Sequence, residues 1–136
     1  MDMLIDFPGG ARVDAHFKGF TVKTDQPVAG GGEDSAPAPF DYFLASMGTC
    51  AGIYILGFCR SRGIPTDNIR ILQQHQVDPT THMITKVTFD IQLPPDFPER
   101  YKPAVIRAAE MCKVKKHLEQ PPTFEVKTTT HELAPA

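Results

Sequence analysis

The longest uncharged stretch of the chain covers residues 42–59, within a mostly apolar segment at residues 39–62. Apolar side chains lie all round a helix drawn through this segment, which is typical of a helix buried on every side. Pro39 suits the first turn of a helix, and the sequence Gly63-Ile64-Pro65 is typical of residues that follow a helix end. The pattern therefore predicts one long core helix, wrapped by the rest of the protein.

One side of this predicted helix carries small residues at spacings of three and four: Ala45, Gly48, Thr49 and Gly52. Such a strip lets another backbone approach closely, and Gly48 with Gly52 also matches a pattern by which membrane helices dimerise. An uncharged run of eighteen residues reaches the lower limit for crossing a bilayer. Its three glycines, one serine and one threonine make it weakly apolar for lipid, however, and nothing at the N-terminus resembles a signal peptide. We therefore expect a soluble helix that packs against its own twin.

Alternation of apolar and polar residues predicts half-buried strands in much of the remaining chain. The clearest alternation places Val87, Phe89 and Ile91 on one face of a strand. Turns are predicted at Lys18-Gly19 and at residues 78–81, so that neighbouring strands form antiparallel hairpins. The predicted strands are, in chain order, residues 4–7, 11–17, 20–24, 68–77, 87–93 and 124–128.

A second long helix is predicted after Asp96, ending before Pro121-Pro122, with Cys112 on its apolar stripe. The Gly- and Pro-rich segment 25–39 is interpreted as a flexible connector, because it lacks the glycine spacing and the Lys-Ser/Thr ending of a phosphate-binding loop. The order of strands, helix, two strands, helix and strand predicts an α+β protein with long helices on a largely antiparallel sheet. Its 136 residues fit a single domain spanning residues 1–136.

Composition narrows the classes of function. The formal net charge is −2 and 22% of the residues are charged, which gives no electrostatic basis for binding nucleic acid. Three cysteines, an odd number, without an export signal favour a reducing cytoplasm over a disulfide framework. We therefore expect a cytoplasmic protein that binds neither nucleic acid nor membrane and keeps its thiols for chemistry or packing.

The three cysteines occupy the two predicted helices. Cys50 and Cys59 lie nine residues apart on the first helix. Their side chains therefore point about 180° apart with a rise of roughly 13 Å, which excludes a disulfide within the helix. Cys112 is the remaining intramolecular partner for either, and the lysines within residues 113–116 favour a thiolate there. A buried structural thiol is the competing interpretation for Cys112 and for Cys50, while Cys59 is interpreted as a core residue.

No cofactor or metal site is predicted from the sequence. The five histidines are spread over separate elements: His16, His75, His82, His117 and His131. None of them makes a convincing ligand pair, and Cys112 with His117 alone is a weak signal. The sequence also lacks a carboxylate pair, a nucleophile elbow and a dinucleotide fingerprint. We therefore expect neither a metal nor a cofactor.

Two segments of the chain resemble the OsmC/Ohr superfamily, the osmotically inducible and organic hydroperoxide resistance proteins. Residues 37–51, PAPFDYFLASMGTCA, are similar to the family's proline-led helix entry, which ends at the first cysteine. Residues 108–118, AAEMCKVKKHL, are similar to its second cysteine motif near the end of the second long helix. The flanking strands and the separation of the motifs also agree, so the resemblance covers nearly the whole chain.

The resemblance implies an OsmC-like fold, in which antiparallel sheets wrap around two long central helices. It also implies an intertwined homodimer with active sites at the subunit interface. The implied chemistry begins with Cys50, which attacks an organic hydroperoxide as a thiolate and becomes a sulfenic acid. Cys112 then resolves the sulfenic acid as a disulfide, and an external dithiol restores the pair.

The chain departs from the active peroxidases of this family at positions around the reactive cysteine. A glutamate follows the helix-entry proline in those members, but Phe40 takes its place here, and Asp41 lies about half a helical turn from the Cys50 direction. Arg12, the only N-terminal arginine, is the candidate counterpart of an arginine that flanks the cysteine in those members. Lys113 stands where they usually carry a proline.

Two functions therefore remain open. Retention of both cysteines favours a thiol-dependent peroxidase, with Cys50, Cys112, Arg12 and Asp41 as its candidate catalytic residues. Loss of the glutamate favours a non-catalytic dimeric protein that binds a small apolar ligand. In either case we expect Cys50 and Cys112 to lie close together, facing one cavity at the dimer interface.

Overall fold

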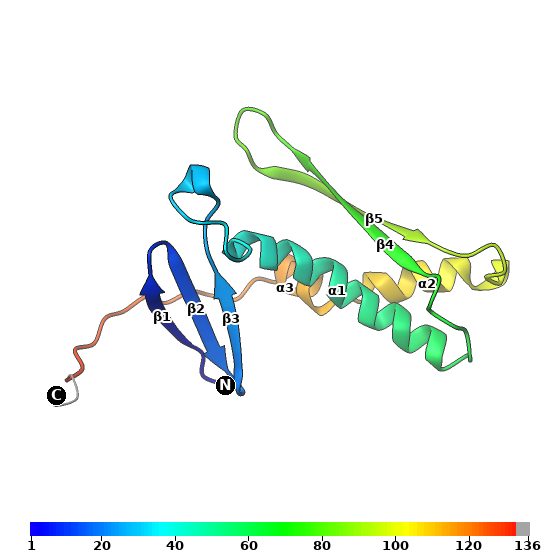
Figure 1. The fold of residues 1–136 in the computed structure, drawn as a ribbon. Helices are drawn as coiled ribbons and strands as arrows, with labels where there is room; N and C mark the ends of the chain where they lie inside the picture. Colours follow the sequence, from blue (N-terminus) through cyan, green and yellow to red (C-terminus); the bar gives the residue numbers. More distant parts are fainter. Residues whose placement is uncertain (133–136) are drawn as a thin grey trace.

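The computed structural model describes residues 1–132 of the chain and combines helices with antiparallel sheets (Figure 1). Its described part contains a three-stranded sheet, a two-stranded sheet and three α-helices. The elements are β1 Leu4–Gly9, β2 Arg12–Phe17, β3 Phe20–Thr24, the 3₁₀ turn η1 Val28–Gly30, α1 Pro39–Arg60, β4 Arg70–Val77, β5 Ile84–Gln92, the 3₁₀ turn η2 Glu99–Tyr101, α2 Lys102–Glu110 and α3 Lys113–Glu119. The predicted α+β class is confirmed.

The N-terminal sheet is a meander in the order β1-β2-β3. Lys18 and Gly19 at its second turn both have positive φ angles, 49° and 80°, which match the twist of the strands that a two-residue turn connects. The hydroxyl of Tyr42 donates a hydrogen bond to the carbonyl of Lys23 over 2.7 Å and ties the sheet to the start of α1. Figure 1 shows this sheet beside the N-terminal end of α1, away from β4 and β5.

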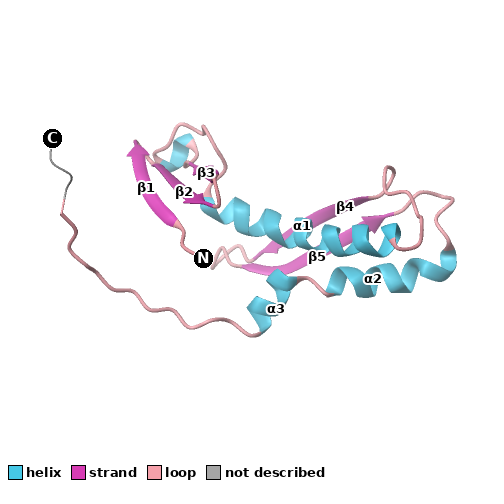
Figure 2. Ribbon diagram, turned by 90° about the horizontal axis from the view of Figure 1, so that it is seen from below, coloured by secondary structure: helices cyan, strands magenta, loops and turns pink. Residues whose placement is uncertain are grey.

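Strands β4 and β5 form a long hairpin whose turn is built around Asp78. The Asp78 Oδ1 atom accepts hydrogen bonds from the backbone N–H groups of Thr81 over 3.0 Å and Thr80 over 2.7 Å. These two bonds hold the pKa of Asp78 below its ordinary value. The predicted turn is therefore confirmed. Figure 2 shows the hairpin running along α1 and α2, so that sheet and helices form two layers.

Helix α1 corresponds closely to the predicted core helix. Pro39 occupies its first turn, and the Asp41 carboxylate accepts a hydrogen bond from the Ala38 N–H over 3.0 Å. This bond satisfies one of the backbone donors that a helix start leaves without a partner. The side chains of α1 that the chain itself buries form a single stripe at a spacing of four: Met47, Ala51, Ile55 and Cys59.

The opposite face of α1 is open to solvent. Its exposed residues also recur at a spacing of four, and they carry no charge: Ala45, Thr49, Ile53 and Gly57. The prediction of a helix wrapped on every side is therefore wrong for the single chain, because only 22% of its most apolar window is buried. By length and composition α1 would suit a membrane span, a criterion that the core helix of a soluble protein meets equally.

Two glycines of the small-residue strip face β4 of the same chain. A Cβ atom at Gly48 would collide with the Oε1 atom of Gln73, and one at Gly52 would lie 3.8 Å from the Cδ1 atom of Ile71. Gln73 reaches across Gly48 to donate a hydrogen bond to the carbonyl of Leu44 over 2.9 Å. The close approach of β4 explains Gly48, while the space beside Gly52 would admit a Cβ atom in ordinary contact. Both glycines face β4 of the same chain, which corrects the expectation that the whole strip serves a twin helix.

The second predicted helix is interrupted. Helix α2 ends at Glu110 and α3 begins at Lys113. Between them Cys112 has φ −48° and ψ 122°, outside the helical region, and it becomes the N-cap of α3. Its thiol accepts the Lys115 N–H over 3.4 Å, which satisfies a donor exposed by the break. The expected second long helix is therefore two shorter ones, with a cysteine at the joint.

The hydrophobic core lies where α1, α2 and the segment before η2 meet the second sheet. Its buried members are Ile55, Cys59, Phe97 and Val105. The ring of Phe58 packs edge-on against that of Tyr101, with centroids 5.8 Å apart. The guanidinium of Arg62 lies 3.9 Å from the centroid of the Phe58 ring and covers this end of the core.

The last predicted strand, at residues 124–128, is absent from the described part of the structure. The segment after α3 forms no ladder with either sheet, and Phe124 and Val126 are 86% and 95% exposed. Figure 2 shows this tail leaving α3 as an extended trace that stays apart from both sheets. Extended backbone becomes a strand only where a neighbouring strand edge receives its hydrogen bonds, and the tail pairs with none of the edges of the two sheets.

The loop between β3 and α1 is organised around Asp25, which is 1% exposed. Its carboxylate accepts hydrogen bonds from the Ser35 hydroxyl and from the N–H groups of Gln26, Glu33 and Ser35. These donors, the Ser35 hydroxyl foremost, lower the pKa of Asp25 to about 2. The expected flexible connector is instead a loop folded around a buried carboxylate.

Candidate functional site

Cys50 and Cys112 meet where α1 packs against the joint between α2 and α3. Cys50 lies within α1, and Cys112 lies in the break that precedes α3. The backbone N–H of Lys113 donates a hydrogen bond to the Cys50 Sγ atom over 3.3 Å. The Cys112 thiol is also close enough to act on Cys50 through a hydrogen bond. The structure thus brings together the two cysteines that the sequence singles out.

The thiol of Cys50 is surrounded by hydrogen-bond donors. Its partial burial on its own would raise the pKa of Cys50. The backbone N–H of Val114, the Cys112 thiol, the backbone N–H of Lys113 and the Lys113 charge act in the other direction and outweigh the burial. The pKa of Cys50 is therefore lowered, which increases the fraction of nucleophilic thiolate near neutral pH.

Cys112 is more enclosed than Cys50. It is 4% exposed, whereas Cys50 is half-buried. The Cys112 thiol donates to the carbonyl of Met47, with 3.8 Å between sulfur and oxygen. Cys50 therefore has the more accessible thiol of the two, with a lowered pKa, and Cys112 has the more enclosed one.

The lysines that follow Cys112 do not all act on that residue. The Lys113 charge lowers the pKa of Cys50, although the sequence places it next to Cys112. Lys115 forms an ion pair of 3.9 Å with Glu119, one turn further along α3. Sequence reasoning missed the contact between Lys113 and Cys50 because it depends on the break before α3 and on the packing of α1 against that break.

Cys59 is separate from the pair and belongs to the core. It is 0% exposed, and burial raises the pKa of its thiol, with the Arg62 charge opposing this effect. A thiol that is both inaccessible and protonated is chemically inert. The position of Cys59 agrees with the structural role that its place on the predicted helix suggests.

Arg12 and Asp41, the other two candidate catalytic residues, form contacts elsewhere in the single chain. The Arg12 Nε atom donates a hydrogen bond to the carbonyl of Gly9 over 3.2 Å, at the turn between β1 and β2. Asp41 accepts the bond that caps the start of α1. Neither residue is among the groups that lower the pKa of Cys50. Catalytic roles for Arg12 and Asp41 stay predictions.

An apolar cavity of about 470 Å³ adjoins the cysteine pair between α1, β5, α2 and α3. Its wall includes Met47, Ala51, Phe89, Ile106, Leu118 and Cys112. Glu110 and Lys115 contribute polar groups to the same wall. This volume and lining suit a small, largely apolar molecule. The wall includes Cys112 but not Cys50, so within the single chain the two thiols do not face this cavity together, contrary to the expectation from the sequence.

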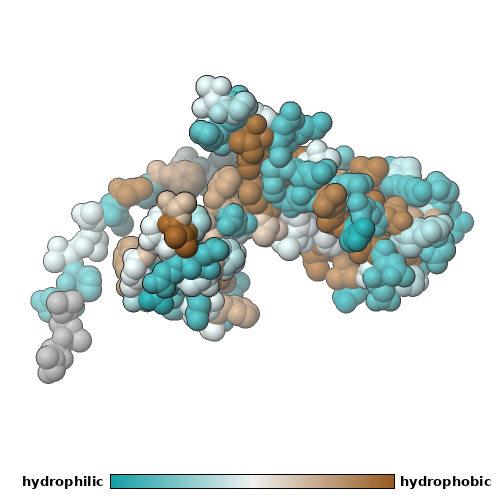
Figure 3. Space-filling model, turned by 45° about the horizontal axis from the view of Figure 1, so that its top comes forward, coloured by the Kyte–Doolittle hydropathy of each residue, from teal (hydrophilic) through white to brown (hydrophobic). Residues whose placement is uncertain are grey.

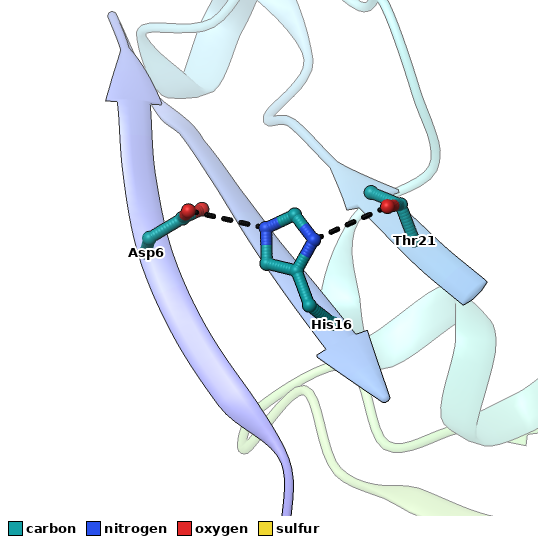
Figure 4. A network of polar contacts seen from close by, with 3 residues as sticks. All are labelled: Asp6, His16 and Thr21. Carbon is teal, nitrogen blue, oxygen red and sulfur yellow. Dashed lines mark hydrogen bonds and ion pairs between the residues drawn. The ribbon is translucent and has the colours of Figure 1, made fainter. Parts of the chain in front are cut away.

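A cluster of polar side chains lies on the N-terminal sheet, apart from the cysteines. The Nε2 atom of His16 lies 3.1 Å from the Asp6 Oδ2 atom, and its Nδ1 atom lies 3.1 Å from the Thr21 Oγ1 atom (Figure 4). Asp14 stands opposite Asp6 in the strand register, so three ligand-type side chains lie within 4.8 Å of one another. Both ring nitrogens of His16 already have partners and the group is open to water, so we interpret it as a surface hydrogen-bond network.

Comparison with known families gives the class of this protein. The sequence pattern of the family described as OsmC-like protein matches residues 31–127, well over half of the chain. The matched range contains both cysteines and every element from α1 to α3. The chain belongs to the OsmC-like protein family, and the resemblance noted in the sequence is confirmed. None of the curated proteins matches the chain significantly.

Solved structures share this fold at low sequence identity. An osmotic stress induced and detoxification response protein from Psychrobacter arcticus 273-4 superposes with a TM-score of 0.70 at 20% identity, covering 84% of this chain and 85% of that chain. The organic hydroperoxide resistance protein OsmC of Legionella pneumophila, described as a predicted redox protein and regulator of sulfide bond formation, superposes with a TM-score of 0.54 at 17% identity. That match covers 87% of this chain and 89% of the other. At such identities the likeness establishes the fold alone.

Proposed function

We propose that this protein is a thiol-dependent peroxidase that reduces organic hydroperoxides through Cys50 and Cys112. The observation that carries the proposal is the half-buried Cys50 thiol, held among donors that lower its pKa, beside the buried Cys112 thiol. The Legionella pneumophila protein of the same fold is described as a predicted redox protein, and this description agrees with a redox reaction at the cysteine pair.

The proposed reaction transfers two electrons from the thiol pair to the peroxide. The Cys50 thiolate attacks the outer oxygen of the hydroperoxide, the O–O bond breaks, and the leaving alkoxide takes a proton to become an alcohol. The Cys112 thiolate then attacks the sulfenic sulfur of Cys50, so that an S–S bond forms and the S–O bond breaks with release of water. An external dithiol reduces this disulfide by exchange and is itself oxidised. The reducing cytoplasm, where three free thiols persist, is the compartment we propose.

Consumption of tert-butyl hydroperoxide in the presence of dithiothreitol tests the proposal. The wild-type protein should turn over repeatedly, whereas Cys50→Ser should not react. When dithiothreitol is omitted, Cys112→Ser should accumulate the sulfenic acid at Cys50. Cys59→Ala is the matched control, because that residue lies outside the pair, and it should retain turnover. A folded wild-type protein that consumes no hydroperoxide would contradict the proposal.

The apolar cavity favours a second candidate function, the binding of a small apolar ligand without catalysis. Its volume of about 470 Å³ falls within the range of ordinary ligand pockets, and its wall is mostly apolar. A fluorescent apolar dye should then bind the wild type and bind more weakly to Ile106→Glu, which places a charge in the wall. Dye binding by a protein that is inert to hydroperoxide would favour this second function.

We also propose that two copies of the chain associate through the exposed face of α1. The chain has an accessible surface of 10883 Å² at a mass of 15.0 kDa, whereas a compact monomer of that mass exposes about 7,000 Å². Figure 3 shows apolar residues interspersed with polar ones over the half of the molecule that contains the second sheet and the helices. A second copy would cover the uncharged stripe that includes Thr49 and Ile53.

Light scattering tests this association. The wild type should be a dimer at micromolar concentration, and Ile53→Glu should shift it towards the monomer, because a charge would be buried in the contact. Lys116→Gln changes an exposed residue of α3 and serves as the control. A wild type that stays monomeric would contradict the proposed dimer.

A further inference from the structure

Lys113 contacts the Cys50 thiol through its backbone, and the charge of its side chain acts on the same thiol. Its N–H group donates a hydrogen bond to the Cys50 Sγ atom over 3.3 Å. Its side chain is exposed and forms no ion pair within residues 1–132, in contrast to Lys115, which pairs with Glu119. No carboxylate of the described chain therefore neutralises the Lys113 ammonium.

We propose that Lys113 is the positioning residue that prepares Cys50 for reaction, because it donates its N–H to the sulfur and holds a positive charge beside it. A benefit for catalysis rests on the proposed peroxidase function. The effect of Lys113 on the ionisation of the Cys50 thiol does not depend on that function. A proline at this position would offer neither a backbone N–H nor a charge. The lysine therefore supplies two contributions that a chain with proline there lacks.

Other charged groups around Cys50 do not account for the effect. Helix α1 carries no charge over residues 42–59, and Arg12 is bonded at the turn between β1 and β2. The charged residues that line the cavity on the far side of the pair are Glu110 and Lys115. Partial burial raises the pKa of Cys50, while hydrogen bonds from the Val114 N–H, the Cys112 thiol and the Lys113 N–H lower it. Among the described residues, Lys113 supplies the charge that lowers it further.

Site-resolved alkylation of the full-length protein tests this inference. Iodoacetamide reacts with the thiolate, so the rate of Cys50 modification against pH, read by peptide mass spectrometry, reports the thiolate fraction without any hydroperoxide. Lys113→Gln keeps the N–H and removes the charge, and it should slow modification at neutral pH by about two- to fivefold. Lys113→Pro removes both contributions at a position where a helix accepts proline, and it should slow modification by about tenfold or more.

Two further variants are the controls. Lys113→Arg keeps both the N–H and the charge and should retain the wild-type profile, and Lys116→Gln should do the same. Identical profiles for the wild type and for folded Lys113→Gln and Lys113→Pro would overturn the inference. If the proline variant fails to fold, the comparison of Lys113→Gln with Lys113→Arg decides the charge contribution. A shifted profile in a protein that consumes no hydroperoxide would leave the inference standing and reject the proposed function.

Discussion

Replacing Gly48 by alanine tests whether α1 packs against β4 as described. The new Cβ atom would collide with the Gln73 Oε1 atom, so the Gln73 side chain must move and give up its 2.9 Å hydrogen bond to the Leu44 carbonyl. That carbonyl keeps its partner within the helix, so the loss is one net hydrogen bond, about 1 kcal/mol. Alanine in a helix interior gains about 1 kcal/mol over glycine. Gly48→Ala should therefore change the free energy of unfolding by less than about 1 kcal/mol.

A double-mutant cycle separates the two opposing effects. Gln73→Ala alone should lower the free energy of unfolding by about 1 kcal/mol. In that background nothing collides with the new Cβ atom, and Gly48→Ala should stabilise the protein by about 1 kcal/mol. Urea denaturation at one fixed protein concentration should thus reveal a coupling of about 1 kcal/mol between the two sites. Equal effects of Gly48→Ala in both backgrounds would refute the packing of Gly48 against Gln73.

Two buried residues, Asp25 and Cys59, give predictions about stability. The pKa of Asp25 is about 2 in the folded protein against an ordinary value of 3.8, so its stabilising effect is complete above pH 3.8 and is lost as the pH falls through about 2. The urea midpoint of the wild type should fall over that pH range, and the midpoint of Asp25→Asn should fall less. If the midpoints of the two proteins fall in parallel with pH, the stabilising role of Asp25 is contradicted. Cys59→Ser should retain hydroperoxide consumption but lose about 1–3 kcal/mol of stability, because it buries a hydroxyl group. A folded Cys59→Ser protein without activity would count against a purely structural Cys59.

Elements marked by turn chemistry were predictable from the sequence. The Lys18-Gly19 turn and the Asp78 turn fix their hairpins through local backbone geometry and local hydrogen bonds, which need no distant partner. The break before α3 has no such marker, because neither glycine nor proline stands at Cys112, and its contacts with α1 join residues far apart in sequence. The tail at residues 124–128 has a strand pattern, but alternation alone cannot supply the edge with which it would pair.

The candidate site was likewise predictable from the sequence only in part. The cysteine motifs identified Cys50 and Cys112 through the family resemblance, and the structure brings these two residues together. The hydrogen bond from Lys113 to Cys50 joins residues far apart in sequence, so no local pattern could reveal it. Likewise, the glycines on α1 suggested a twin helix, whereas Gln73 of β4 occupies the space beside Gly48.

Peptide mapping after hydroperoxide treatment tests the pairing of Cys50 with Cys112 most directly. Reduced protein is treated with one equivalent of tert-butyl hydroperoxide, its remaining thiols are blocked, and the digest is examined by mass spectrometry. We expect a cross-linked peptide that joins Cys50 to Cys112, with Cys59 still reduced, and a sulfenic acid at Cys50 in Cys112→Ser. A folded protein in which Cys50 stays reduced would contradict the peroxidase function and leave apolar-ligand binding in its place.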